Sequence, residues 1–232
     1  MAGGARRLES TDRANPVKQP IGLRLVTWNV HGTARPDPVA IARAIIELEP
    51  DVICFQEIRR HQARRVAKVL GWPRGFWTFK HNAWYILPFR AEGLAILASN
   101  GVRIGATTVL SRPVPWFSHR RRVAQMAWVG KWPIVNTHLS NESDRDRLLE
   151  LHQLLGFVPT GAIIAGDLND GAASSLVGAL VGAGWQHRTP DPDCRDFVLA
   201  PQSARLLSVT VVERKVPWSL LSDHVPVVAM IE

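Results

Sequence analysis

Apolar residues along the chain gather into many short runs, which are separated by polar residues and by a few longer mixed segments. Apolar runs of about four to eight residues are typical of buried strands, whereas longer segments with an apolar stripe are typical of helices. The pattern predicts strands over residues 21–28, 51–55, 75–85, 94–98, 102–110, 122–129, 133–137, 162–165, 197–200, 208–213 and 225–231. It predicts helices over residues 39–48, 59–70, 143–155 and 172–183.

Residues that start or stop helices support these boundaries. Asp37 and Pro38 come directly before the first predicted helix, where an aspartate N-cap and a proline in the first turn are favoured. Pro50 lies just beyond its end, and Gly71 follows the second predicted helix, which is rich in basic residues. Because proline and glycine commonly mark the ends of helices, these residues agree with the hydropathy pattern.

The order of the elements predicts an α/β fold. Strands follow one another closely between residues 75 and 137, which favours antiparallel pairing there. We expect mixed sheets with helices on the outside, in one domain over residues 21–232 after a disordered basic tail over residues 1–20. The tail lacks the apolar stretch of a secretory signal, and no apolar run approaches about 18 residues. A cytoplasmic protein without a transmembrane segment is therefore predicted.

Composition excludes several classes of protein. The chain has 232 residues, of which 46% are hydrophobic and 21% are charged, and this balance excludes a disordered chain. Its only cysteines are Cys54 and Cys194, too few for a disulfide scaffold or a cysteine-rich zinc module.

Charge is distributed unevenly along the chain. The formal net charge is +8. Residues 58–141 contain 14 basic residues and a single acidic one, Glu92, whereas residues 142–232 contain 7 basic and 12 acidic residues. Such asymmetry suggests an anionic partner, which is a nucleic acid, a phosphorylated head group or an acidic membrane surface. A basic surface that serves only solubility is the alternative.

Polar residues suited to chemistry stand at the ends or starts of the predicted strands. In a mixed sheet, the ends of some strands and the starts of others share one edge, so we expect these side chains to meet. They are Asn29, Glu57, His138, Asp167, Asn169, Asp196, Asp223 and His224. A single polar residue at a strand end is commonly a turn residue or a helix cap. Eight such residues, all at strand ends or starts, are not readily explained by turns and caps.

The chemistry of this set favours metal-assisted hydrolysis of a phosphate ester. Oxygen-rich ligands suit Mg²⁺ or Mn²⁺, whereas zinc prefers more histidine or cysteine. A bound cation polarises a phosphoryl oxygen, a carboxylate takes a proton from water, and imidazoles stabilise the developing charge. The phosphate-binding loop, the G-x-S-x-G elbow and the H-E-x-x-H motif are all absent from the sequence.

Seven short motifs occur in an order that resembles one known family. They are TWNV (27–30), QE (56–57), EGLAILAS (92–99), NTHLS (136–140), GDLND (166–170), RDFVLA (195–200) and SDHVPVV (222–228). Together they resemble the endonuclease/exonuclease/phosphatase superfamily, which has the deoxyribonuclease I-like fold. The resemblance covers about residues 23–231 and implies a four-layer α/β/β/α sandwich of two mixed sheets.

The resemblance also implies roles for the residues that match. It implies a divalent cation, Mg²⁺ or Mn²⁺, bound by Asn29, Glu57 and Asp223. It implies a catalytic set of His138, Asp167, Asn169, Asp196 and His224. The aspartate matched by Asp167 activates or positions the attacking water, and the aspartate matched by Asp196 fixes the phosphate-contacting histidine matched by His224. His138 argues against the abasic-site repair branch, which typically has asparagine there.

The substrate is less firmly indicated. Residues 72–90 mix aromatic and basic side chains, and the helix predicted over 59–70 is basic, as suits a nucleic-acid strand. The alternatives are rings packed between two sheets and a solvated basic face. Two more residues are candidates for substrate binding: Arg122, expected at the active-site edge, and Glu92, expected to orient His138.

Three functions remain open from the sequence. A metal-dependent nuclease that hydrolyses phosphodiester bonds ranks first. A lipid or inositol-phosphate phosphoesterase, similar to sphingomyelinases or inositol phosphatases, ranks second, because a basic aromatic surface also suits anionic head groups. A catalytically silent binding module ranks third, because no expected site residue is missing.

Overall fold

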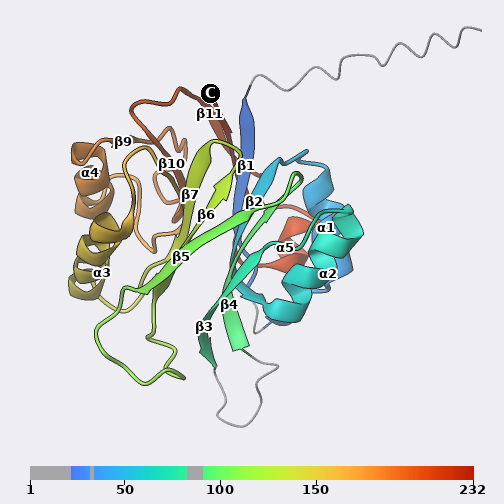
Figure 1. The fold of residues 1–232 in the computed structure, drawn as a ribbon, viewed down its shortest axis with the longest axis horizontal. Coiled ribbons are helices and arrows are strands. Elements are labelled where there is room, and N and C mark those ends of the chain that lie inside the picture. Colours follow the sequence, from blue (N-terminus) through green and yellow to red (C-terminus); the bar gives the residue numbers. More distant parts are fainter. Residues whose placement is uncertain (1–21, 32–33, 83–90) are drawn as a thin grey trace, which may run out of the picture.

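The computed structural model describes residues 22–31, 34–82 and 91–232. Within them, two six-stranded sheets lie between layers of helices (Figure 1). The first sheet has the order β11 (Leu206–Val211), β12 (Val227–Ile231), β1 (Leu23–Asn29), β2 (Val52–Arg59), β4 (Ala91–Ala98), β3 (Phe76–Asn82). The second has the order β5 (Arg103–Val109), β6 (Val123–Val129), β7 (Trp132–His138), β8 (Ile163–Asp167), β10 (Asp196–Pro201), β9 (Trp185–Gln186).

Each sheet has one parallel pair of strands inside it. β1 runs parallel to β2, with Asn29 opposite Gln56, and β7 runs parallel to β8, with His138 opposite Asp167. The neighbouring β10 is antiparallel to β8, so that Asp196 at its start lies opposite Asp167 at the end of β8. Strand ends and strand starts therefore share one edge, as the sequence predicted.

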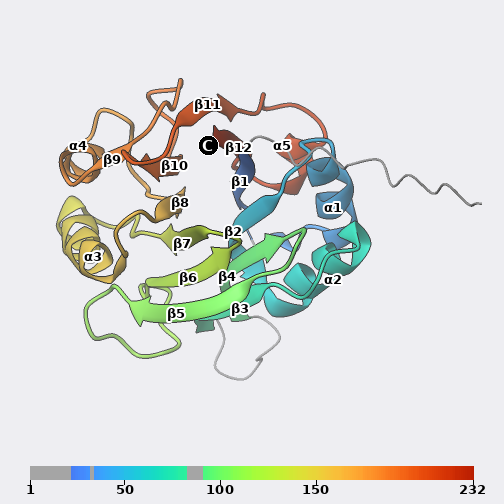
Figure 2. The same cartoon turned by 45° about the horizontal axis from the view of Figure 1, so that its top comes forward.

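Helices cover the outer face of each sheet, and the two sheets face each other (Figure 2). The first sheet is covered by α1 (Pro38–Ile46), α2 (Arg60–Leu70) and α5 (Trp218–Leu221), and the second by α3 (Asp144–Phe157) and α4 (Ser175–Gly182). The predicted start of α1 is confirmed, because the Asp37 carboxylate accepts hydrogen bonds from the backbone N–H groups of Val39 and Ala40. α2 ends at Gly71, whose φ of 71° is left-handed, as is common after a helix.

Three apolar cores hold the four layers together. Successive residues of a strand point to opposite faces, so β2 serves two of these cores. Ile53 and Phe55 pack with the helices outside the first sheet, whereas Val52 and Cys54 pack against the second sheet. The third core lies between the second sheet and α3 and α4. The α/β/β/α sandwich of two mixed sheets is thereby confirmed.

The structure differs from the sequence prediction in a few elements. The strands predicted over 94–98 and 102–110 do not pair, because β4 and β5 belong to different sheets. α4 is shorter than predicted, since the Ser174 hydroxyl caps it by accepting from Val177 N–H. α5 and β9 are short elements that the hydropathy pattern did not indicate. The predicted tail over 1–20 and the last residues of the strand predicted over 75–85 lie outside the described residues.

Among the described residues, no helix combines the length and the apolar composition needed to cross a membrane.

Candidate active site

Glu57 stands near the end of β2 in a strained backbone conformation. The pairing of β2 with β4 shifts register between Phe55 and Ile58, and φ of Glu57 is 56°, which non-glycine residues rarely adopt. A bulge of this kind bends the strand and re-aims a side chain, often next to an active site. The Oε1 atom of Glu57 lies 3.7 Å from Nδ1 of His138, which belongs to the other sheet.

Asn29 and Asp167 join the two sheets at the centre of the site. The Asn29 amide, at the end of β1, donates through Nδ2 to Oδ2 of Asp167 over 3.0 Å. Oδ1 of Asp167 accepts from the backbone N–H of Asn169 at 2.9 Å, and Asn169 itself has a left-handed φ of 52°. Burial, together with the negative charge of Asp196, raises the pKa of Asp167 to about 7. A carboxylate poised near neutral pH is suited to accept a proton.

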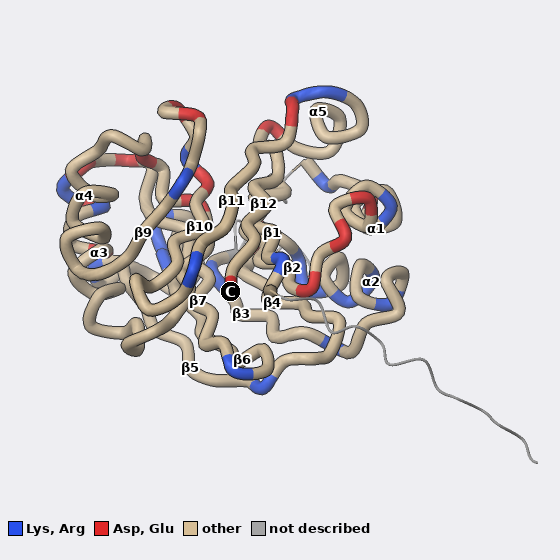
Figure 3. The backbone as a smooth tube through the Cα atoms, turned by 90° about the horizontal axis from the view of Figure 1, so that it is seen from above, with Lys and Arg blue, Asp and Glu red and all other residues tan. Residues whose placement is uncertain are grey.

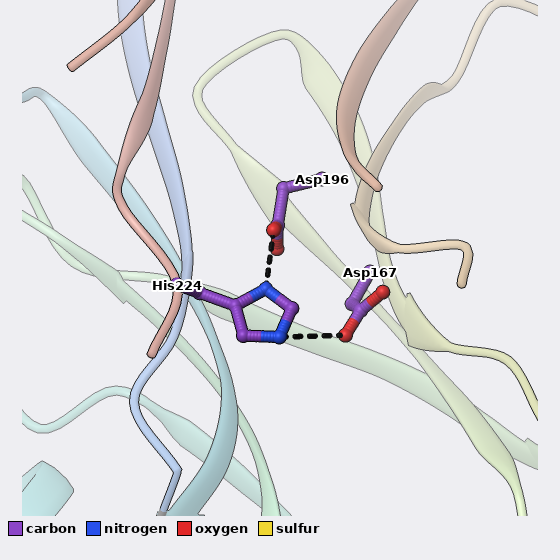
Figure 4. Close-up of side chains that lie close together, drawn as sticks. All are labelled: Asp167, Asp196 and His224. Carbon is purple, nitrogen blue, oxygen red and sulfur yellow. Dashed lines mark hydrogen bonds and ion pairs between the residues drawn. The ribbon is translucent and has the colours of Figure 1, made fainter. Parts of the chain in front are cut away.

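His224 and Asp196 form a close pair beside Asp167 (Figure 4). Nδ1 of His224 lies 2.6 Å from Oδ2 of Asp196, and its Nε2 lies 3.8 Å from Oδ2 of Asp167. Burial acts to lower the pKa of His224, but the hydrogen bond and charge of Asp196, with the charge of Asp167, outweigh burial and raise the pKa to about 9. His224 is therefore an imidazolium at neutral pH, with Nε2 directed toward the centre of the site.

Lys80 is a site residue that was not predicted from the sequence. Its ammonium is 3.3 Å from Nδ1 of His138 and 3.9 Å from Oε1 of Glu57, and only 2% of the residue is exposed. Burial and the nearby Arg122 lower the pKa of Lys80 to about 8, against the raising effect of Glu57. Lysine alternating with aromatic residues in a strand usually marks an exposed edge, so no local signal in the sequence indicated this position.

His138 is neutral and has a defined tautomer. Burial and the charges of Lys80 and Arg122 lower its pKa well below the usual value. An ammonium has donors only, so Nδ1 of His138 accepts from Lys80 and the imidazole proton resides on Nε2. That nitrogen lies 3.6 Å from Oδ2 of Asp167. A polar series thus runs from Glu57 through His138 to Asp167.

The two residues predicted to bind substrate are buried and face other partners. Oε2 of Glu92 lies 3.7 Å from Nε2 of His81, and no contact with His138 is found in the described part of the chain. Arg122 is 3% exposed and donates through Nη2 to Oδ1 of Asn141 at 3.2 Å. The structure places Lys80, rather than Glu92, against Nδ1 of His138. Substrate binding by Glu92 and Arg122 remains a prediction.

Asp223 is linked to the predicted metal ligand Asn29 through His31, whose backbone N–H donates to Oδ1 of Asn29. Oδ1 of Asp223 is 3.1 Å from Nδ1 of His31, and the Asp223 side chain is 58% exposed. The exposed Asp223 side chain contacts His31, whereas the His224 ring contacts Asp196. Among the residues that the structure describes, no contact joins Asp223 to Glu57. A part for Asp223 in metal binding remains a prediction.

A network of buried side-chain amides joins the two sheets next to the site. Gln56, which precedes Glu57, donates through Nε2 to Oδ1 of Asn136 at 2.8 Å and to Oγ1 of Thr27 at 3.0 Å. Nδ2 of Asn136 donates to the carbonyl oxygens of Phe55 and Ala95, at 2.9 and 3.1 Å. Asn136 belongs to the second sheet and its partners to the first, so these bonds fix the distance between the strands that carry Glu57 and His138.

The residues of the site fit a divalent cation. Asp196 has a buried Oδ1 without a hydrogen-bond partner among the described residues, and the raised pKa of Asp167 reflects carboxylates crowded out of water. A divalent ion relieves such crowding. Asp167, Asp196 and His224 offer ligand atoms within 4.8 Å of one another. Because a metal requires a neutral imidazole, the imidazolium of His224 favours carboxylate oxygens over this histidine as ligands.

Comparison with known proteins assigns the two-sheet sandwich to a family of phosphoesterases. The model of the Endonuclease/Exonuclease/phosphatase family matches residues 26–224. The chain belongs to this family, whose members are phosphoesterases that generally depend on a divalent metal. No curated protein matches the chain.

Solved structures show the same fold at low sequence identity. An endonuclease/exonuclease/phosphatase from Beutenbergia cavernae DSM 12333 has a TM-score of 0.74 and 20% identity, over 91% of this chain and 71% of that one. A mannosyl-6-phosphatase from Bacteroides thetaiotaomicron has a TM-score of 0.66 and 17% identity, over 90% of this chain and 99% of that one. D. rerio TDP2, complexed with a single strand DNA product, has a TM-score of 0.65 and 16% identity, over 91% of this chain and 99% of that one. Identities this low support the fold alone.

Proposed function

We propose that this protein is a divalent-metal-dependent phosphodiesterase that cleaves nucleic acid. One observation carries the proposal. Asp167, with a pKa raised to about 7, lies 3.8 Å from the imidazolium of His224, whose pKa is about 9. Between these two pKa values Asp167 is an ionised base and His224 a protonated donor, and such a pair side by side suits in-line attack of water on a phosphate.

In this proposal each residue has one task. Asp167 takes the proton of the attacking water, and the amide of Asn29 holds its carboxylate in place. His224 donates from Nε2 to a phosphoryl oxygen, and Asp196 keeps that ring aimed. Nε2–H of His138 offers a second donor to the phosphate.

Glu57 and Asn29 are the residues that would hold Mg²⁺ or Mn²⁺. Bound there, such an ion polarises a phosphoryl oxygen and stabilises the charge on the leaving oxygen. Lys80, when protonated, brings a positive charge to the same end of the site, within 3.9 Å of the Glu57 carboxylate. The ion and the lysine together would balance the carboxylates and the phosphate.

The choice of nucleic acid as substrate rests on charge. Residues 58–141 carry 14 basic residues and one acidic residue, and α2, which begins three residues after Glu57, carries four of these basic residues. One structural neighbour, D. rerio TDP2, is complexed with a single strand DNA product. Another structural neighbour is a mannosyl-6-phosphatase. A small phosphate monoester is therefore included among the substrates to be assayed. A phosphorylated lipid or inositol stays the second candidate because of the same basic surface.

A panel of phosphate esters tests the proposal. Purified protein is incubated with single-stranded DNA, RNA, phosphoinositide vesicles, sphingomyelin and a hexose 6-phosphate, each with Mg²⁺, with Mn²⁺ and with chelator. We expect cleavage of nucleic acid that stops on chelation. Turnover of only the lipid or sugar substrates would overturn the substrate choice. No turnover of any ester would favour the catalytically silent binding module.

Variants with conserved shape separate the site from the surface. Glu57→Gln and His224→Gln should each lower the rate by roughly 100-fold or more, because each removes a charged group from the reacting phosphate. Glu47 is an exposed glutamate ten residues before Glu57. Glu47→Gln is therefore the control and should leave the rate unchanged. Unchanged hydrolysis in both site variants, with folds intact by circular dichroism, would overturn the assignment.

A further inference from the structure

A second concave region lies outside the candidate active site. It is a cavity of about 400 Å³ between α2, the start of β3 and the edge strand β5. β3 and β5 are edge strands of the two different sheets, so the cavity opens where both sheets end. The side chains that give it its character are Arg60, Arg64, Arg74, Phe76, Trp77 and Ile104.

We propose that this cavity binds single-stranded nucleic acid next to the cleaved bond, and the proposal rests on the function proposed above. The guanidinium groups would contact successive phosphates, and the aromatic and aliphatic side chains would contact a base and its sugar. The site would thus lengthen the substrate contact beyond the reacting phosphate and favour a polymer over a small ester.

The charge of the cavity is entirely positive. Arg60, Arg64 and Arg74 line it together, and no acidic residue does. Basic positions recur along α2 (Figure 3). Within the described ranges, none of the three arginines has a salt bridge, although other arginines such as Arg24 and Arg147 do. Guanidinium groups gathered without a counter-ion attract an anion with several charges.

The spacing of the arginines suits a strand of phosphates. Arg60 and Arg64 are four positions apart on α2, on one face of the helix and about 6 Å apart along its axis. This separation is comparable with that of successive phosphates along an extended single strand. Arg74 faces them from the loop that leads into β3. A single compact anion would not need guanidinium groups from both segments.

The cavity also has an apolar wall. The Trp77 indole is held in place because its Nε1–H donates to the carbonyl oxygen of Ile58 at 2.9 Å, and Arg60 lies 6.0 Å from the ring centroid. Ile104 is 63% exposed although it is a large hydrophobic residue. Proteins bind single-stranded nucleic acid with basic groups that contact its phosphates and aromatic side chains that stack on its bases. A bilayer surface is flat and does not enter a cavity of this size.

The cavity is connected to the candidate active site through the chain itself. Ile58, which accepts the hydrogen bond from Trp77, directly follows Glu57, and Arg60 begins α2 two residues later. The sequence also allowed these aromatic rings to pack between the two sheets. That alternative holds for Phe76 but not for Trp77, which packs on the outer side beneath α2.

Binding of a fluorescent single-stranded oligonucleotide to the full chain tests the proposal. The probe is titrated against Asp167→Asn protein, which binds without cleaving. Arg60→Glu/Arg64→Glu is compared with Arg65→Glu/Lys68→Glu, which carries the same charge change on the same helix at positions that do not line the cavity. Circular dichroism confirms that both variants fold.

We expect the cavity pair to weaken binding roughly tenfold or more and the control pair to weaken it less than about threefold. The slope of log affinity against log salt should fall by roughly 0.7 for each phosphate that the protein no longer neutralises. Equal weakening by both pairs would show diffuse attraction to a basic helix and would overturn the proposal. An equal preference for duplex, or weakened binding to anionic vesicles alone, would overturn it as well.

Cleavage assays separate this proposal from the proposed function. If the wild-type chain cleaves the oligonucleotide, Arg60→Glu/Arg64→Glu should raise KM at least roughly fivefold while kcat changes little. Cleavage with an unchanged KM would overturn the proposal that the cavity binds the substrate strand, but it would not contradict the proposed nuclease function. If the chain cleaves no nucleic acid, the proposed function fails, and the binding comparison still decides whether the cavity holds a strand.

Discussion

The Lys80 ammonium lies 3.3 Å from Nδ1 of His138, so a buried cation fixes the tautomer of a candidate catalytic histidine. The same ammonium lies 3.9 Å from the Glu57 carboxylate, where the divalent ion is expected. Lys80 and the metal therefore bring like charge to neighbouring positions. The lysine should weaken metal binding while it helps to hold the phosphate.

Replacing Lys80 with methionine should separate these two effects. Mg²⁺ affinity, measured by isothermal titration calorimetry, should rise by roughly tenfold, because a like charge a few ångströms away is removed. Turnover should fall by roughly 100-fold, because the phosphate loses a cation and His138 loses its tautomer partner. Lys80→Arg keeps the charge and should not raise the affinity. Weaker metal binding by Lys80→Met would show that the lysine serves packing alone.

The rate of hydrolysis should follow a bell-shaped pH profile. Asp167 must be ionised, and its pKa is raised to about 7. Lys80 and His224 must both be protonated, and their pKa values are about 8 and about 9, so the rate should be highest between about pH 7 and pH 8. In Asp196→Asn the pKa of His224 loses its main raising influence, so the descending limb should move to lower pH. A descending limb that does not move in this variant would assign it to Lys80 alone.

The same pair makes stability depend on pH. The folded-state pKa of His224 is about 9, above its ordinary value of 6.5. Protonated His224 therefore stabilises the fold fully below about pH 6.5, and this stabilisation is lost as pH rises through about 9. Urea unfolding of the wild type and of Asp196→Asn should show a difference in free energy that is largest near pH 6 and shrinks toward pH 10. A difference that is constant across this range would exclude the linkage.

The layout of the fold could be predicted because it depends on local patterns. Alternating apolar runs indicated the strands, and Asp37 and Gly71 marked helix ends. The sequence could not show that β4 and β5 belong to different sheets, because a short connection favours pairing of the two strands it joins but does not require it. Strand-end logic likewise located Asn29, Asp167 and His224 but not the direction of each side chain.

Two residues show why part of the site escaped prediction. Asp223 adjoins His224 in sequence, yet its exposed side chain contacts His31, whereas His224 contacts Asp196. Lys80 is buried by the facing sheet, and burial of a lysine depends on partners that are distant in sequence, such as Glu57 and His138. Both outcomes are set by tertiary contacts, which hydropathy does not encode.

Asp167→Asn should abolish activity and also stabilise the protein. The folded-state pKa of Asp167 is about 7 against an ordinary value of 3.8, so ionising this buried carboxyl costs stability as pH rises between these values. The variant and the wild type should melt at similar temperatures near pH 4, and the variant should melt several degrees higher at pH 8. Asp193→Asn, at an exposed aspartate, should show no such trend. A variant that is less stable at pH 8 would mean that the carboxylate is a net stabiliser.

Asn136→Ala should destabilise the sandwich without altering a reacting group. Its amide donates to the carbonyl oxygens of Phe55 and Ala95 and accepts from Gln56, all fully within the interior. Alanine removes the side-chain donor from two buried carbonyl oxygens, at roughly 1–3 kcal/mol for each unsatisfied group, whereas Nε2 of Gln56 keeps its hydrogen bond to Thr27. We expect the free energy of unfolding in urea to fall by about 2–4 kcal/mol, whereas Asn100→Ala, at an exposed turn, should change it by less than about 0.5 kcal/mol. A change as small as that of the control would mean that water or a repacked neighbour satisfies these groups, and that the two sheets are held at their spacing by apolar packing alone.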